Sequence, residues 1–361
     1  MSHRDNLDPL RGLAAGAVVA HHYKAYTGLS MPWISDVGGL LGVQMFFVLS
    51  GYLITASAAR HDWRTYLVRR AFRIYPAYWV ALVGVGVLVS GVSYWPVPED
   101  WPDRLLNFFA LGHLTPAALR HDVLTVSWTL TSEWAWYLSA PVLVALAARC
   151  AEGRVGRHFW AIALTVGVLV AVAWVWAAQK HLLDPLYAAE MRRVGADPIT
   201  DFMRFAYISN APPAQYVFFL LGAAAHRYEA ALGQLPAWLL AGAVLLFVGP
   251  AVHWNAWLGL APSPASGIGL TALLLLLLRT PTVRWRWPHA LGEMAYPIYL
   301  LHVPVIIVVF NRLQWQGAAG LLASLVALLA ASAALHRWVE RPLNEFGRRL
   351  QPGRTVARAH G

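Results

Sequence analysis

The sequence contains a single cysteine, Cys150, and charged residues make up only 13% of its 361 positions. One cysteine cannot form an intrachain disulfide or a cysteine-based metal site, and we expect no bound metal. Soluble domains normally carry about 25% charged residues. Apolar residues account for 58% of this chain, and it holds 18 Trp, a residue that favours membrane interfaces. This composition predicts an integral membrane protein.

The acidic residues are fewer than the basic ones, which leaves a net charge of +10. In a soluble protein, such an excess would indicate a nucleic-acid partner. Here the arginines mostly flank apolar segments, as the positive-inside rule requires, so we expect membrane lipid around the chain and no nucleic acid.

The predicted fold class is all-α: a polytopic transmembrane helical bundle of about ten spans. Each apolar segment has about the length that a bilayer requires. Placing the N-terminus in the cytoplasm leaves most Lys and Arg residues inside, so both termini are predicted to be cytoplasmic. We expect residues 1–345 to form one transmembrane domain and residues 346–361 a short basic tail. The predicted spans are 10–27, 37–58, 76–92, 127–148, 159–178, 209–226, 236–253, 264–279, 292–311 and 318–337.

Arg11 and His22 are eleven residues apart within the first predicted span. Eleven helical residues return to within roughly 20° of the starting direction and rise roughly 16 Å. Both groups therefore share one helix face. Because ionisable groups within spans usually face a protein interior or a wet cavity, the pair predicts a cavity through the membrane. His21 is a rival, but it points roughly 100° away.

Glu133 lies near the start of the fourth predicted span, which begins on the outer side. We expect it at the depth of His22, where a carboxylate would fix the histidine tautomer and raise its basicity. The alternative is a structural polar clamp between two helices.

Arg69, Arg70 and Arg73 precede the third predicted span. Arginine forks match phosphate oxygens, so a cytosolic phosphorylated ligand could bind here with help from Arg11. The alternative is ordinary positive-inside topology or binding of anionic lipid.

Three further features are less specific to one kind of site. Ser50 and Gly51 lie within the second span, where small residues favour close helix packing. His302, near mid-depth in the ninth span, either lines the cavity or bonds a neighbouring helix. The segment RWVERP, with Glu340, is interpreted as the capped and paired end of the last span.

Six segments, in order, resemble the motifs of acyltransferase family 3, membrane proteins that O-acylate bacterial surface carbohydrates and related acceptors. The likeness extends from residue 7 to residue 343. The segments are LDPLRGLAAGAVVAHH, GVQMFFVLSGYLIT, RRAFRIYP, SWTLTSEWAWY, YPIYLLHVP and VERP.

The resemblance implies a multi-pass enzyme of the bacterial cytoplasmic membrane. It uses acyl-CoA, most often acetyl-CoA, as a co-substrate without a bound cofactor, and its acceptor is a hydroxyl of a carbohydrate, glycolipid or similar compound. His22 is implied as the essential catalytic histidine and Arg11, Arg70 and Arg73 as important arginines, with Arg69 beside them; Glu133 is carried over less securely. We expect an oxyanion donor among Ser50, Trp128 and Tyr299, with or without an acyl-enzyme on His22 or Ser50.

Two other classes fit the composition. A transporter of an anionic or acylated small molecule would also place charge within spans, although the chain shows no two related halves. A membrane scaffold without catalysis would need neither Arg11 nor His22.

Overall fold

Every regular element in the part of the chain that the structure describes is a helix. This structure is a computed structural model, and it describes residues 6–88, 101–150, 154–195, 197–251, 263–281 and 285–350. The longer helices are α1 (Leu7–Thr27), α2 (Ile34–Ala58), α3 (Trp63–Leu88), α6 (Trp128–Arg149), α7 (Arg154–Gln179), α10 (Pro212–Arg227), α12 (Ala237–Phe247), α14 (Pro264–Arg279), α16 (Ala295–Ile306) and α17 (Gly317–Leu335).

Shorter helices connect and cover these. They are α4 (Trp101–Phe108), η3 (Gly112–Leu114), α5 (Pro116–Arg120), α8 (Asp184–Arg193), α9 (Asp201–Met203), η4 (Arg204–Ser209), α11 (Glu229–Leu232), α15 (Arg286–Glu293), η5 (Ile307–Arg312), η6 (His336–Glu340) and α18 (Arg341–Leu350). The elements η4, η5 and η6 are π-helical turns.

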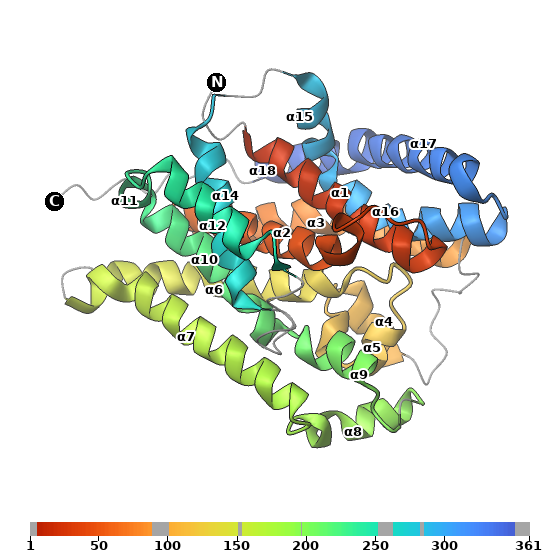
Figure 1. Ribbon diagram of the computed structural model, residues 1–361, viewed down its shortest axis with the longest axis horizontal. Coiled ribbons are helices and arrows are strands. Elements are labelled where there is room, and N and C mark those ends of the chain that lie inside the picture. Colours follow the sequence, from red (N-terminus) through yellow and green to blue (C-terminus); the bar gives the residue numbers. More distant parts are fainter. Residues whose placement is uncertain are drawn as a thin grey trace.

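Helices α1 and α2 occupy the centre of the bundle, while α7 and α17 lie on opposite sides of it (Figure 1). Small residues let the central helices approach closely. A Cβ added at Gly222 of α10 would lie 2.0 Å from the Val48 carbonyl oxygen of α2, and one at Gly51 would lie 2.1 Å from that of Phe219. The packing interpretation of Gly51 is therefore confirmed, and the contact holds α2 against α10.

Each of the ten predicted spans overlaps a helix, and the helices follow in the predicted order. Among the described residues, four helices are long and apolar enough to cross a membrane: Ile34–Ala58, His158–Gln179, Ala295–Arg312 and Gly317–Leu350. Helix α3 begins at Trp63, before the third predicted span, and continues through Pro76. The sixth starts too early, because Pro212 and its neighbour form the first turn of α10, where proline is tolerated.

Glu340 of the RWVERP segment is paired, as predicted, but the last helix does not end there, so the expected helix end is wrong. The chain continues from α17 through the π turn η6 into α18, which reaches Leu350. Gly347 packs against Phe72 of α3, which anchors α18 along that helix. The expected tail therefore begins within a helix; residues 351–361 lie outside the described residues.

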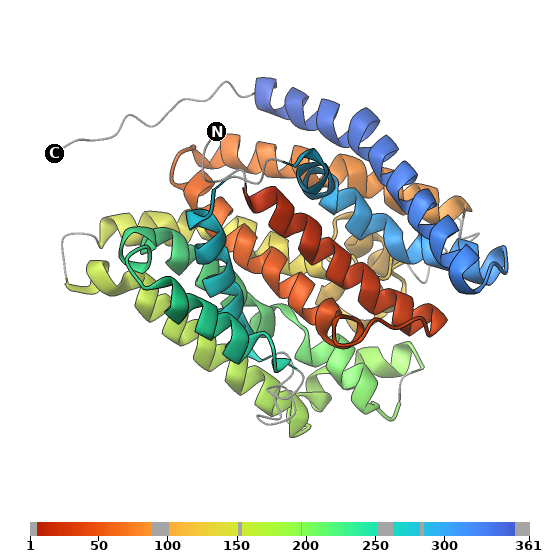
Figure 2. The same cartoon turned by 45° about the horizontal axis from the view of Figure 1, so that its top comes forward.

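The segment before α6 folds back over the start of that helix. The His113 backbone N–H donates to Thr131 Oγ1 at 3.1 Å, and Thr131 Oγ1 donates to the Ala110 carbonyl at 3.2 Å. Ala110 and Ala118 are fully buried. Helix α6 therefore starts beneath a cap formed by α4, η3 and α5. Figure 2 shows the whole bundle turned by 45° from the view of Figure 1.

Candidate active site

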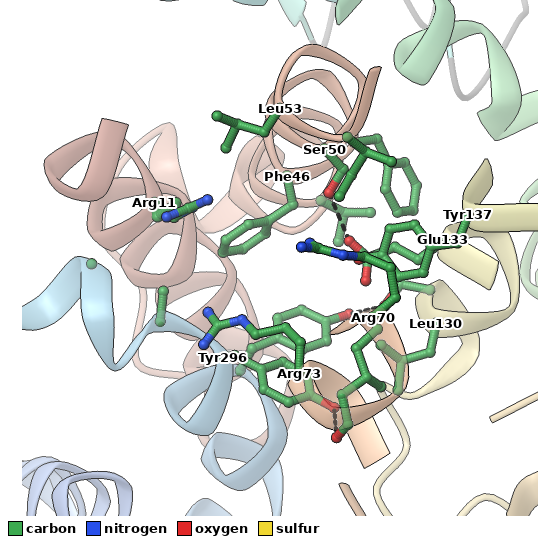
Figure 3. A pocket seen from close by; sticks show the side chains of 18 residues that line it. Arg11, Phe46, Ser50, Leu53, Arg70, Arg73, Leu130, Glu133, Tyr137 and Tyr296 are labelled. Carbon is green, nitrogen blue, oxygen red and sulfur yellow. Dashed lines mark hydrogen bonds between the residues drawn. The ribbon is translucent and has the colours of Figure 1, made fainter. Parts of the chain in front are cut away.

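Three arginine side chains from two helices face one cavity of about 140 Å³, which we call the arginine cavity. Arg11 comes from α1, and Arg70 and Arg73 come from α3 (Figure 3). Like charges repel, so an arrangement of three guanidinium groups around one space favours an anionic ligand. The apolar part of the wall includes Val43, Phe46, Phe47, Leu53, Ile54, Ile74 and Leu130.

The three arginines differ in their partners. Arg11 pairs with Asp8, one turn away, at 2.7 Å. Arg73 pairs with Glu340, a fully buried carboxylate. Within the described residues, Arg70 has no ion pair, and its buried Nε has no hydrogen-bond partner. Arg70 is therefore the cation of this site with the most unused binding capacity.

Glu340 is a residue of the site whose role the sequence did not reveal. Besides Arg73, it binds His336 Nδ1 at 2.8 Å, within the π turn η6. The sequence holds a signal, because the last quoted motif is an acid followed by arginine and proline; it predicts a paired carboxylate but does not identify Arg73 as the partner. Glu340 instead holds Arg73 beside the cavity.

Arg69 is not among the residues that line the arginine cavity. His61 Nδ1 donates to the Ser57 carbonyl at 3.0 Å, so its Nε2 accepts from Arg69 Nη1 at 2.5 Å. Neighbouring positions on a helix point roughly 100° apart. The basic segment therefore sends Arg70 and Arg73 into the cavity and Arg69 to one side.

Glu133 lies in the arginine cavity, and the expectation that it partners His22 is wrong. Its Oε1 accepts a hydrogen bond of 2.8 Å from Ser50 Oγ of α2. Gly42 of α2 packs on the Ala14 carbonyl of α1, and Ser50 follows Gly42 by eight residues in the antiparallel helix. Ser50 and Glu133 therefore lie near the level of the start of α1, far from the level of His22. The expectation failed because α6 begins beneath the cap and presents Glu133 to α2, where Ser50 binds it, and not to His22 of α1.

His22 is paired with another histidine. Its Nδ1 lies 3.1 Å from His302 Nε2 of α16 and 3.0 Å from the Val18 carbonyl oxygen. His21 faces the other way, with its Nδ1 2.8 Å from the Ser35 carbonyl and its ring against Gly39 of α2. His21 thus belongs to the α1–α2 interface, while His22 faces α16.

Tyr299 lies between the arginine cavity and the histidine pair. It lines the cavity, its hydroxyl donates to the Val126 carbonyl at 2.9 Å, and its ring centroid is 5.8 Å from that of His302. Phe46 packs edge-on against Tyr299 at 5.9 Å. His22 and His302 do not line the cavity. The rings of Phe46 and Tyr299 therefore form the wall of the cavity on the side of the histidine pair.

Among the described residues, Trp128 neither lines the cavity nor contacts the histidine pair. Its ring lies edge-to-face on His113 with centroids 5.5 Å apart. Of the expected oxyanion donors, Ser50 and Tyr299 line the cavity and Trp128 does not.

Comparison with known proteins gives a consistent result. An acyltransferase domain family model matches residues 4–337. A protein of Komagataeibacter xylinus named as the membrane-bound transacylase BcsY is 25% identical, over 92% of this chain and 80% of its own. The acyltransferase MdmB of Streptomyces mycarofaciens is 26% identical over 97% and 94%. A Staphylococcus aureus protein named as an O-acetyltransferase is 25% identical over 48% and 30%. No solved structure matches.

Proposed function

The chain belongs to the acyltransferase family whose domain model covers residues 4–337, and from this premise we propose that it transfers an acyl group from acyl-CoA to a hydroxyl of a carbohydrate or glycolipid. The chain is a membrane acyltransferase, and we place it in the bacterial cytoplasmic membrane with both termini inside. We propose acetyl as the transferred acyl group, in keeping with the O-acetyltransferase name of one relative.

One observation carries the proposal: the convergence of Arg11, Arg70 and Arg73 on one cavity. Acyl-CoA is a phosphate-rich anion, and guanidinium groups bind phosphate oxygens through paired hydrogen bonds. Arg70, which has no ion pair among the described residues, is free to bind a phosphate without displacing a carboxylate. The donor phosphates bind at this cavity. The long pantetheine arm carries the thioester toward His22 once the packed rings of Phe46 and Tyr299 move apart to admit it.

His22 acts as the general base in this proposal. Its Nε2 takes the proton of the acceptor hydroxyl while the hydroxyl oxygen attacks the thioester carbonyl carbon. The tetrahedral intermediate then collapses, the carbon–sulfur bond breaks, and the CoA thiolate takes the proton back from His22. The products are the acyl ester and free CoA, so no acyl-enzyme is needed.

Incubation of the purified protein with labelled acetyl-CoA and candidate glycans tests the proposal directly. Wild-type protein is expected to transfer label to a hydroxyl acceptor. The His22→Ala variant should lose about 10²- to 10⁴-fold in rate, the usual contribution of a general base, while its thermal unfolding and CoA binding stay close to wild type. Full activity in His22→Ala, or flux of a small molecule across vesicles without acyl transfer, would contradict it.

A further inference from the structure

The two histidines of the site come from different helices and are in direct contact. His22 of α1 is partly accessible, whereas His302 of α16 is fully buried. Their ring centroids are 4.8 Å apart, and His302 Nε2 lies 3.1 Å from His22 Nδ1. His302 therefore contacts the ring nitrogen of His22 that the proposed base chemistry does not use.

Two backbone carbonyls determine where the protons of this pair lie. The Tyr299 carbonyl oxygen is 2.8 Å from His302 Nδ1, and the Val18 carbonyl oxygen is 3.0 Å from His22 Nδ1. A carbonyl oxygen can only accept a hydrogen bond, so each Nδ1 must carry a proton. A neutral imidazole carries one proton, and the Nε2 of His302 is therefore a lone-pair acceptor directed at His22.

The His22 Nδ1–H is then shared between two acceptors, Val18 O and His302 Nε2. The other tautomer of His22 would set the Nδ1 lone pair against both acceptors, which is repulsive. Among the described residues, no hydrogen bond engages His22 Nε2. The arrangement leaves that nitrogen unprotonated and available, as a general base requires.

We propose that His302 is a positioning residue that holds His22 in its Nδ1–H tautomer and aims Nε2 at the acceptor hydroxyl. This inference rests on the proposed function, in which His22 Nε2 is the base. The role is that of the third member of a catalytic triad, but the acceptor is a neutral imidazole in place of a carboxylate. Glu133 does not fill the role because it is bonded to Ser50 in the arginine cavity.

Two substitutions at one position separate this role from simple packing. The His302→Gln variant keeps an acceptor atom near the position of Nε2, whereas His302→Met fills the space without one. We expect kcat for acetyl transfer to fall about 10- to 100-fold in His302→Met, the range known for partners that fix the tautomer of a metal-bound histidine. The KM for acetyl-CoA should stay within about twofold of wild type, since the arginine cavity is untouched, and His302→Gln should restore most of kcat.

Nitrogen-15 NMR of histidine-labelled protein gives a readout that does not depend on acyl transfer. With His22→Ala used for assignment, His22 should show a protonated Nδ1 in wild type and in His302→Gln, and a substantial Nε2–H population in His302→Met. Unchanged kcat in His302→Met, equal losses in both variants, or an Nδ1–H signal retained in His302→Met would each overturn the inference. If wild-type protein transfers no acyl group, the proposed function fails, while the NMR result still decides the tautomer assignment.

Discussion

Ser50 of α2 and Glu133 of α6 are joined by a hydrogen bond of 2.8 Å, and both side chains line the arginine cavity. This contact places the carboxylate among cations rather than beside the histidine that it was expected to orient. It also divides the site into two parts. One part, at the level of the start of α1, contains the three arginines; the other contains His22, the proposed general base.

The bond between Ser50 and Glu133 should contribute measurably to stability. We expect Ser50→Ala and Glu133→Ala each to lower the free energy of unfolding in detergent, because the first removes a donor to the carboxyl group and the second leaves the Ser50 hydroxyl without its acceptor. A double-mutant cycle should give a coupling of about 1–3 kcal/mol, as for a hydrogen bond to a charged group. Effects that simply add, with no coupling, would show that the two residues do not interact.

Arg70 and Arg69 form a matched pair for testing donor binding. They are adjacent on α3, but Arg70 lines the arginine cavity and Arg69 binds His61 instead. Isothermal titration with CoA should show Arg70→Gln weakening the Kd about 10- to 100-fold, the equivalent of a lost charge-assisted hydrogen bond. Arg69→Gln should stay within about threefold on the same basis, because its side chain lies outside the cavity. Equal losses in the two variants would argue against the cavity as the binding site.

The crossing of α2 and α10 should not tolerate a methyl group. We expect Gly222→Ala to destabilise the protein by about 1–3 kcal/mol or more, since its Cβ would lie 2.0 Å from a carbonyl oxygen of α2 and the helices would have to separate. Gly16→Ala is the control, because a Cβ there meets no atom within 4 Å. Thermal unfolding in detergent compares the two; equal midpoints would refute the close contact.

An ion pair between α8 and η4 should make stability depend on pH. Arg204 binds Asp184 through two hydrogen bonds, of 3.1 and 2.8 Å, and these hold the pKa of Asp184 below its ordinary value. The stabilisation is thus fully present above the unfolded-state pKa of about 4 and is lost as pH falls through the lower folded-state pKa.

Asp184→Asn should therefore lower stability at pH 7 by about 1–3 kcal/mol, and the difference from wild type should shrink below about pH 4. Asp201 is a control, because it contacts the same arginine but its side chain is 99% exposed. Asp201→Asn should change stability by less than about 1 kcal/mol. A difference for Asp184→Asn that persists unchanged at acidic pH would contradict the assignment.

Much of the fold was predictable because apolar length and small residues act locally. The ten expected spans each overlap a helix, and the packing role of Gly51 followed from its size. Helix boundaries were harder to predict from the sequence. The start of α3 at Trp63 has a local signal, because the Asp62 side chain accepts from the backbone N–H groups of Arg64 and Thr65. The continuation through η6 has no such signal, because the Arg73–Glu340 pair and the contacts of α18 with α3 join positions far apart in the chain.

The site divides in the same way. The cavity residues Arg11, Arg70 and Arg73 could be predicted because helical periodicity and the quoted motifs mark them. The partner of His22 could not be predicted in this way. The sequence gives the depth of Glu133 only through its distance along the chain from the predicted start of a span, and that distance does not identify the neighbouring helix. Glu133 instead binds Ser50 of α2, and α16, far away in the chain, supplies His302 as the partner of His22.

The aromatic end wall formed by Phe46 and Tyr299 has a consequence for the membrane itself. A bore left open from the cytosol to the outer leaflet would let protons and small ions cross and would dissipate the membrane potential. Because the rings of Phe46 and Tyr299 pack against each other on the side of the histidine pair, they would have to part for a long substrate arm to pass, and their repacking after each turnover would limit ion leakage through the bilayer.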